Sequence, residues 1–195
     1  ASKNPELEIV VLTSAAEPQE ANTYYAQGGI IGRGPQDSID LLMEDLYRAG
    51  DQANYPPAVR LLAQEGPRLI NEYLIGLAGV DFDRHIGEKL AYTREASHST
   101  ERILHVGDAT GRAIEVGLIR ALKERPNVRL LTRHTAVDLI TPSHHSRDPR
   151  DVYAPLSCVG AYVLEQETGE VYRMLARKTV LATGGLGQIF LHTTN

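Results

Sequence analysis

The chain has 195 residues, of which 42% are apolar and 23% charged, which is typical of a globular protein with its own core and excludes a disordered or fibrous chain. The formal net charge of −5 argues against nucleic acid as the main partner, because phosphate binding favours a basic face. No apolar run approaches the roughly 20 residues that span a bilayer, so we expect no membrane partner. A single cysteine, Cys158, excludes a disulfide framework within the chain and fits a reducing cytoplasm.

The first half of the chain is predicted to hold one strand and then helices. Ile and Val dominate residues 8–13, which is the pattern of a strand buried on both faces. Ser38 is a good N-cap for an amphipathic helix that ends near residue 50. A second helical stretch covers about 57–78, and we expect it to split at Pro67, which has no backbone N–H to donate.

The second half is predicted to be irregular at first and then rich in strands. Residues 80–107 show no clear period, and Asp108 or Thr110 is expected to cap a third helix that Pro126 stops. The last third is predicted to begin with one extended stretch at 128–140 and a polar loop at 141–155. A hairpin of 157–166 with 171–176 and a further strand at 179–183 are predicted to follow. This order of elements predicts an α/β domain with a small β-meander.

A glycine-rich segment at 22–30 has the composition of a ligand-binding loop. Gly28 and Gly29 let the backbone approach a ligand closely, and Thr23 and Gln27 add hydrogen-bonding groups. A phosphate or a planar ring rich in acceptors suits such a surface. A plain glycine turn between a strand and a helix is the alternative, and composition alone favours it.

A second candidate is 180–187, where an apolar strand is expected to end in glycines. Open α/β sheets bind ligands at the carboxyl ends of their strands, but a simple exit from strand to loop explains the pattern equally well. Neither segment is a dinucleotide fingerprint, because the chain contains no G-x-G-x-x-G and no P-loop. Spacing therefore does not establish a nucleotide site.

Polar side chains are dense in 93–99, inside the irregular segment. Glu95 is a candidate anchor for a cationic group of a substrate, and Arg94 or Arg102 is an alternative partner for it. A solvated loop with surface ion pairs is the simpler interpretation. The stretch 108–112 offers a helix N-terminus to an anion, although a helix cap is the favoured interpretation. The seven histidines match no ligand spacing, so we expect no metal site.

Together these segments resemble one family. The motifs that carry the resemblance are NTYYAQGGI at 22–30, TRE at 93–95, DATGR at 108–112, TAVDL at 135–139, LATGG at 181–185 and TTN at 193–195. Each motif is weak alone, and their common order resembles the L-aspartate oxidases, which group with the flavoprotein subunits of succinate dehydrogenase and fumarate reductase. The resemblance covers about residues 8–195.

The resemblance implies an α/β fold, an FAD-binding domain of the glutathione-reductase type. It also implies that 1–195 is an incomplete FAD-binding domain. In the family a strand, a G-x-G-x-x-G turn and a helix precede this region, and a capping domain and a helical C-terminal domain follow it. We therefore expect the isolated chain to be inactive and to bind FAD weakly, because the pyrophosphate-binding helix is missing.

The same resemblance implies the residues that bind the cofactor. The pyrophosphate and the flavin ring would be lined by Asn22, Thr23, Tyr24, Tyr25, Ala26, Gln27, Gly28 and Gly29. Thr135 and Ala136 would touch the adenine side. Ser14 would lie near the adenosine, where the family often has a lysine. Respiratory relatives carry a flavin-linked histidine where this chain has Asn22, so FAD is expected to be held non-covalently.

Glu95 is the catalytic residue that the resemblance implies, with the role of orienting the substrate. Respiratory relatives have an aromatic residue there, whereas aspartate oxidases have a glutamate that faces the α-ammonium group of the substrate. Succinate and fumarate lack this group, so a buried carboxylate would have no partner with them and would be costly. Aspartate supplies a charged donor for the carboxylate.

The implied activity is oxidation of L-aspartate to iminoaspartate, with hydride passing from Cα to flavin N5 and with dioxygen or fumarate reoxidising FAD. This is the first step of the de novo quinolinate route of NAD biosynthesis, which implies a functional link to quinolinate synthase. Two alternatives stay open. One is a fumarate reductase or succinate dehydrogenase flavoprotein, which Glu95 and Asn22 oppose. The other is a non-enzymatic α/β module whose glycines serve only turns.

Overall fold

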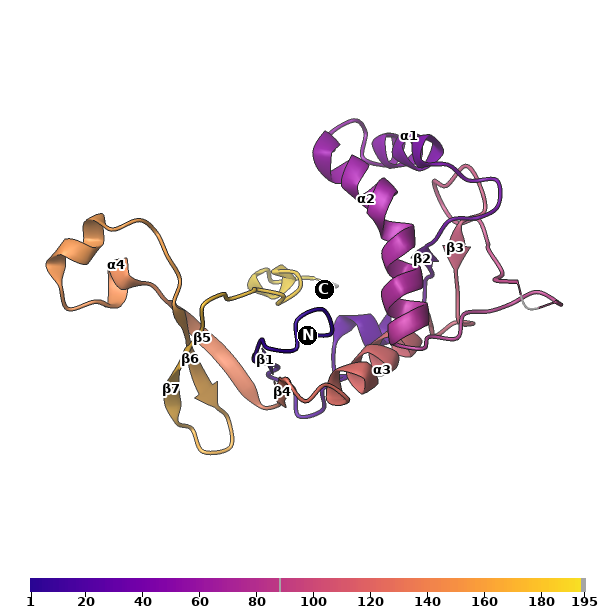
Figure 1. Ribbon diagram of the computed structural model, residues 1–195. Helices are drawn as coiled ribbons and strands as arrows, with labels where there is room; N and C mark the ends of the chain where they lie inside the picture. Colours follow the sequence, from indigo (N-terminus) through magenta and orange to yellow (C-terminus); the bar gives the residue numbers. More distant parts are fainter. Residues whose placement is uncertain (88, 194–195) are drawn as a thin grey trace. The chain divides into compact units, whose positions relative to one another are not determined.

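The structure is a computed structural model that describes residues 1–87 and 89–193 and divides into two compact units (Figure 1). Unit 1 comprises Ala1–Glu20 and Pro126–Asn195, and unit 2 comprises Ala21–Arg125. Helices and strands both occur, so the mixed helix–strand class predicted from the sequence is confirmed.

Unit 2 is mainly helical. Its α-helices are α1 (Ile39–Ala49), α2 (Pro56–Leu69) and α3 (Thr110–Lys123). It also contains the 3₁₀ helix η1 (Asn22–Tyr25), the π-helix η2 (Ile70–Leu77), and the antiparallel strand pair β2 (Ile30–Ile31) and β3 (Ile103–Leu104). The core of this unit is a buried apolar cluster of Ile70, Leu74, Ala78, Val80, Phe82 and Leu104.

Helix α1 forms where the sequence predicts it. The Ser38 hydroxyl accepts a hydrogen bond from the Leu41 N–H at 3.1 Å, which satisfies one of the free donors of the first turn. Gly50 follows the last turn as the C-cap residue. Leu42 is fully buried on the apolar side of the helix, so local capping and burial agree about its position.

The expected break at Pro67 is wrong. Helix α2 continues through Pro67 to Leu69 and passes directly into η2, and Figure 1 shows the two as one unbroken helix. Pro67 removes the N–H that would reach the Ala63 carbonyl in an α-helix. The Arg33 guanidinium donates to that carbonyl at 2.7 Å instead, so the Ala63 carbonyl keeps a hydrogen-bond partner although the helix has lost its own donor there.

Helix α3 begins at Thr110, but neither predicted capping residue caps it. Ala109 is the N-cap residue and makes no side-chain cap. The Thr110 hydroxyl accepts from the Val106 N–H at 3.0 Å, so it holds the preceding loop and not the first turn of the helix. The helix ends before Pro126, as predicted. The described residues of 80–107 are irregular apart from β3 and isolated bridges, which also agrees with the sequence.

Unit 1 is mainly β. Strands β1 (Ile9–Leu12) and β4 (Val128–Leu131) pair in parallel, and β5 (His134–Ile140), β6 (Gly160–Glu165) and β7 (Val171–Leu175) form an antiparallel sheet in that order. The predicted single stretch over 128–140 is therefore wrong. Arg133 adopts a φ of +54° between β4 and β5, and this turn sends the two strands to different partners.

Burial of β1 on both faces is also not observed, since Val10 is 36% exposed. Among the described residues β1 pairs only with β4, so one strand edge has no neighbour. The hairpin of β6 and β7 is confirmed, and Gly169 supplies the positive φ of +74° that its turn needs. The polar loop before β6 contains the short helices α4 (Pro142–His145) and η3 (Pro149–Tyr153).

The strand expected at 179–183 does not form. Val180 is 84% exposed and Leu181 is 63% exposed, and no described strand pairs with this stretch. An apolar run becomes a buried strand only when neighbouring strands cover it, so periodicity alone was not sufficient here. The 3₁₀ turn η4 (Gly187–Ile189) follows the glycines, so the second glycine candidate is an exposed irregular segment.

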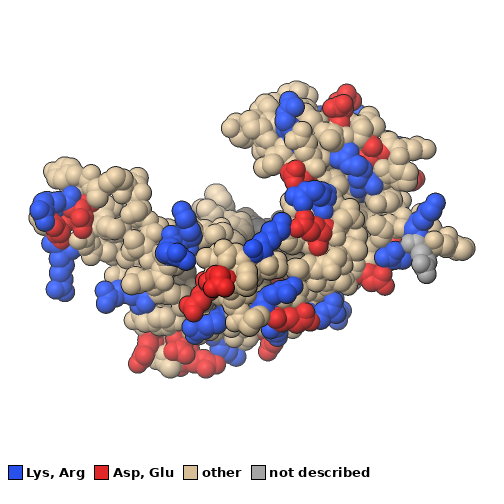
Figure 2. All heavy atoms as spheres, in the orientation of Figure 1, with Lys and Arg blue, Asp and Glu red and all other residues tan. Residues whose placement is uncertain are grey.

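Charge is mixed on the face drawn in Figure 2, where basic and acidic side chains alternate over both units. This pattern agrees with the mildly acidic composition and differs from the basic face that phosphate backbones favour. Within the described residues, no helix has the length and apolar character needed to cross a bilayer.

Candidate functional site

The glycine segment Asn22–Gly29 lies along the surface of unit 2, at the N-terminal end of α3. The 3₁₀ turn η1 forms its first half, and the chain then extends from Ala26 towards β2. Six of its eight residues are exposed: Asn22, Thr23, Tyr25, Ala26, Gln27 and Gly28. The segment therefore presents backbone and polar side chains to solvent and does not pack them into a core.

Helix α3 fixes this segment through a glycine. The Gly111 N–H donates to the Ala26 carbonyl at 3.0 Å. A Cβ atom on Gly111 would lie 2.0 Å from the Thr23 carbonyl oxygen, so only glycine permits this approach. The Arg112 guanidinium lies 5.5 Å from the centre of the Tyr24 ring, within cation–π range. The motif at 108–112 thus holds the glycine segment in place through Gly111 and Arg112.

The space around Gly28 and Gly29 shows whether the segment leaves room for a cofactor. A Cβ atom on Gly28 would meet no atom within 4 Å, so the backbone there is open. A Cβ atom on Gly29 would lie 2.2 Å from Ile103 Cγ2 and 2.8 Å from His105 Cε1, so that glycine is needed for packing. An open backbone strip supported from behind is a surface that accepts a phosphate or a planar ring, so the residues fit FAD.

Glu95 lies in the irregular segment before β3, with its side chain 42% exposed. Its Oε1 atom lies 3.0 Å from Nε2 of His105, and the same nitrogen lies 2.6 Å from Oγ1 of Thr93. Ala96, the next residue, adopts a φ of +40°, which turns the chain at this point. Since His105 also packs against Gly29, the imidazole joins Glu95 to the glycine segment.

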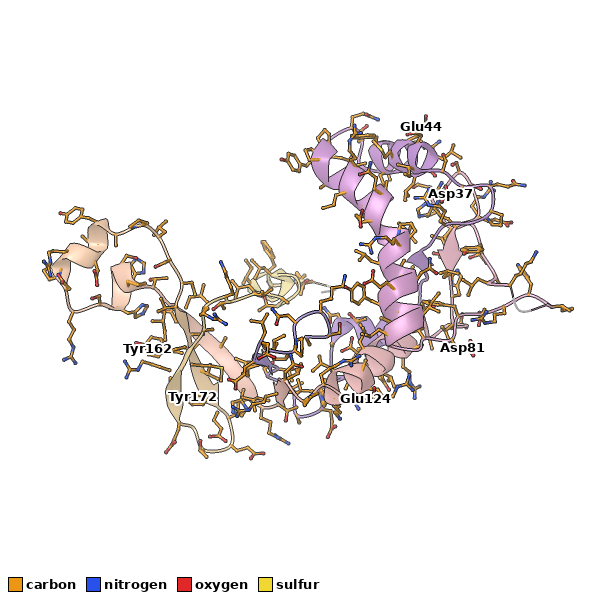
Figure 3. The ribbon with its side chains drawn as sticks, viewed as in Figure 1. Asp37, Glu44, Asp81, Glu124, Tyr162 and Tyr172 are labelled. Carbon is orange, nitrogen blue, oxygen red and sulfur yellow. The ribbon has the colours of Figure 1, made fainter. Side chains whose placement is uncertain are left out.

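Arg102, one of the two cations considered as partners for Glu95, is occupied elsewhere. It is fully buried and donates to Asp45 at 2.6 Å and to Asp37 at 2.7 Å, while His98 Nδ1 accepts from it at 3.1 Å. Figure 3 labels Asp37, which precedes α1. The stretch 93–99 itself is mostly exposed and carries the Glu95–His105 ion pair, as expected of a solvated loop, but the buried Arg102 and Asp45 hold it from below.

Asp45 anchors the loop that carries Glu95 to helix α1. Its Oδ2 accepts from the N–H of Ser99 at 2.8 Å and from the Ser99 hydroxyl at 2.9 Å, and its Oδ1 pairs with Arg48. Burial by itself raises the pKa of Asp45, but the two Ser99 hydrogen bonds and the Arg102 guanidinium outweigh it and hold the pKa below the usual value. The carboxylate is thus a charged fixed point under the loop.

Ser14, Thr135 and Ala136, the residues expected on the adenosine side, belong to unit 1. Gln166 joins the first two, because its Nε2 donates to the Ser14 carbonyl at 3.1 Å and to the Thr135 hydroxyl at 2.8 Å. Ala136 is exposed on β5. The structure therefore brings Ser14 and Thr135 to one place, where β1 ends and β5 begins.

Three residues of these arrangements were not found from the sequence: His105, Arg102 as a buried cation, and Gln166. The signal for His105 was weak, namely a polar residue directly after the apolar pair Ile103-Leu104. Within the described residues, no group of three or more His, Cys, Asp or Glu side chains is placed to hold a metal ion. The last two residues of the TTN motif, Thr194 and Asn195, lie outside the described residues.

An open glycine strip next to a partly exposed carboxylate, on a mixed helix–strand fold, indicates a cofactor-binding protein. The chain belongs to the FAD binding domain family, which it matches over residues 2–195. FAD is therefore the cofactor of its family.

The chain is also homologous to L-aspartate oxidases from plants and bacteria. It is 38% identical over 187 residues to the chloroplastic L-aspartate oxidase 2-a of Nicotiana tabacum, covering 95% of this chain and 28% of the relative. It is 38% identical over 200 residues to the L-aspartate oxidase of Pseudomonas aeruginosa, covering 98% of this chain and 36% of the relative. The chain thus spans about a third of the length of these relatives.

Solved structures share the fold. Mycobacterium smegmatis Sdh1 in complex with UQ1 is 25% identical, with a TM-score of 0.84 over 100% of this chain and 32% of that chain. An E. coli quinol fumarate reductase is 20% identical, with a TM-score of 0.85 over 97% of this chain and 30% of that chain. The second likeness shows the fold alone.

Proposed function

We propose that the full-length protein carrying this chain is an FAD-dependent L-aspartate oxidase that converts L-aspartate to iminoaspartate. The observation that carries the proposal is the position of Glu95. It is a partly exposed carboxylate, joined through His105 to a glycine segment that fits FAD. The identity of 38% to plant and bacterial L-aspartate oxidases supports the same assignment.

The cofactor residues are assigned within each unit. In unit 2 the segment Asn22–Gly29 lines the pyrophosphate and the flavin ring, which its exposed backbone at Gly28 supports. In unit 1 Ser14, Thr135 and Ala136 face the adenosine. We assign the glutathione-reductase type to this FAD-binding domain and a non-covalent attachment to the cofactor, because Asn22 offers an amide where a covalent link needs a nucleophilic ring nitrogen. When bound, FAD supplies the acceptor for the two electrons that leave the substrate.

Glu95 binds the α-ammonium group of aspartate. An ionised carboxylate that gains an ammonium donor forms a short, charge-assisted hydrogen bond. A dicarboxylate without an amino group gives Glu95 no such partner, and a carboxylate of the substrate would instead repel it. Glu95 therefore selects aspartate over succinate and fixes the Cα–H bond of aspartate in place before the electrons leave.

Fumarate or dioxygen is the proposed final electron acceptor. The product is an imine of oxaloacetate, which the quinolinate route of NAD biosynthesis consumes, so quinolinate synthase is the proposed functional partner. A cytoplasmic location accords with the free thiol of Cys158.

The substitution Glu95→Gln in the full-length, FAD-loaded protein tests the proposal. It keeps the shape of the side chain and removes its charge, so kcat/KM for aspartate should fall about 10- to 100-fold, the range for a lost hydrogen bond to a charged group. Fumarate reduction by the same variant should change little. Equal losses on the two substrates would show that Glu95 does not discriminate, and a gain of succinate oxidation without loss on aspartate would favour a fumarate reductase or succinate dehydrogenase.

A further inference from the structure

His105 contacts Glu95 from a fixed position. It follows β3 directly, and its backbone carbonyl accepts from the Asp83 N–H at 2.8 Å. Its side chain is 19% exposed, and its Cε1 atom lies close enough to Gly29 that a Cβ atom there would come within 2.8 Å. The backbone on one side and the glycine segment on the other therefore hold the imidazole in place.

The contacts of Nε2 favour a proton on this nitrogen of His105. Nε2 lies 3.0 Å from Glu95 Oε1, and an ionised carboxylate only accepts hydrogen bonds. Nε2 must therefore carry a hydrogen, because a bare lone pair facing the carboxylate would be repulsive. Thr93 Oγ1 lies 2.6 Å from the same nitrogen, and its hydroxyl oxygen can accept from an Nε2–H as well.

Among the described residues, His105 is the side chain recorded in contact with the Glu95 carboxylate. Its side chain is 42% exposed, and it stands on an irregular segment where the next residue has a positive φ. A glutamate with three rotatable bonds at such a position samples several rotamers, and holding it in one costs side-chain entropy. The 3.0 Å contact with His105 Nε2 is made by Oε1, so Oε2 is left for a donor on the substrate.

We propose that His105 is a positioning residue that determines substrate specificity: its Nε2–H holds Glu95 so that the carboxylate meets the ammonium group of an amino-dicarboxylate beside the glycine segment. The inference rests on the proposed function. It adds a second residue to the recognition of the amino group, and it predicts that the two residues act as one unit.

The test compares three substitutions in the full-length, FAD-loaded protein. His105→Leu removes the donor and should raise KM for aspartate about tenfold, as expected for one hydrogen bond to a charged group, while KM for fumarate stays unchanged. His105→Gln places an N–H near the position of Nε2 and should restore most of the affinity. His85→Leu changes an exposed histidine of the same unit and is the matched control, with no change expected on either substrate.

A double-mutant cycle separates positioning from general damage. If His105 acts only through Glu95, His105→Leu should have no further effect on KM for aspartate in the Glu95→Gln background. Additive effects, or an equal rise of KM for aspartate and fumarate, would overturn the inference. Thermal unfolding of each variant checks folding. If His105→Leu has a lowered melting temperature, His105→Asn replaces it in the cycle.

A spectroscopic readout does not depend on turnover. In the ¹⁵N-histidine NMR spectrum of the chain, His105 should show a protonated Nε2, and its signal should shift in Glu95→Gln. An unprotonated Nε2, or a signal that Glu95→Gln does not move, would overturn the inference. If His105→Leu lost the preference for aspartate over fumarate while Glu95→Gln kept it, the proposed function itself would be contradicted. Discrimination by Glu95 without any effect of His105 would leave the proposed function intact and remove only this inference.

Discussion

The two units bury their apolar side chains to very different extents. Among the described residues, eleven buried apolar side chains belong to unit 2, and only Ile140, Ala161 and Val163 belong to unit 1. In unit 1, Tyr153 and Leu156 are each 90% exposed and Leu191 is 92% exposed. Unit 2 therefore closes a core of its own, whereas unit 1 depends mainly on its strand ladders.

Buried polar groups follow the same division, since Asp45, Arg102 and Thr110 all belong to unit 2. Two of them lie under the loop that carries Glu95. The comparison teaches that Glu95, the proposed substrate-binding residue, belongs to the better packed unit, where a buried ion cluster fixes its loop. A site that must hold a carboxylate in one direction gains from such support.

The largest expected effect is that of Arg102→Met. It leaves the buried Asp37 without its cation and leaves Asp45 with Arg48 alone, so the free energy of unfolding of unit 2 should fall by about 3–5 kcal/mol. Urea denaturation followed by hydrogen exchange measures each unit separately, and amides of β5 and β6 in unit 1 should keep their protection. Arg68→Met removes two exposed ion pairs, with Glu65 and Glu72, and is the matched control, with an unchanged unfolding midpoint expected. Equal loss of protection in both units would break the comparison.

A smaller effect is expected for Gly111→Ala. The added Cβ would lie 2.0 Å from the Thr23 carbonyl, so the backbone of η1 or α3 must shift at a cost of about 1–3 kcal/mol. Gly28→Ala is a matched control in the glycine segment, because a Cβ at Gly28 meets nothing within 4 Å, and its melting temperature should stay unchanged. Calorimetry compares the two variants. An unchanged melting temperature in Gly111→Ala as well would mean that the glycine segment is not held tightly by α3.

The smallest effect is a change in the acid stability of unit 2. The pKa of Asp45 is lower in the folded chain than its usual value of 3.8, so the carboxylate contributes stability that is fully present above about pH 4. That contribution is lost as the pH falls through the lower folded pKa. The urea midpoint of unit 2 should thus decline on acidification, and Asp45→Asn should decline less steeply. An equal acid slope in the two proteins would show that Asp45 does not couple folding to protons.

Much of unit 2 and the hairpin of unit 1 were predicted correctly because their signals are local. The cap of α1 joins Ser38 to a residue three positions away, and the turn of β6 and β7 needs one glycine with a positive φ. The order of the short motifs likewise indicated a flavin-binding family. Such features depend on neighbours in sequence, which a pattern can read.

The errors share one cause, namely partners that are distant in the chain. Helix α2 passes through Pro67 because Arg33, 30 residues from Ala63, donates to the carbonyl that proline leaves without a donor. The stretch 179–183 carries the composition of a strand, but no described strand pairs with it. Secondary-structure propensity describes which conformations a segment tolerates, and its tertiary contacts decide which of them it adopts.

The sequence by itself determined the fold class, the glycine segment and the choice of Glu95 as the residue of interest. Only the tertiary structure decided that Arg102 turns inward to Asp37, 65 residues away, and that His105 is the side chain that meets Glu95. The physical reason is that a buried charge takes whichever partner the closed core places beside it, and that placement depends on contacts across the whole unit.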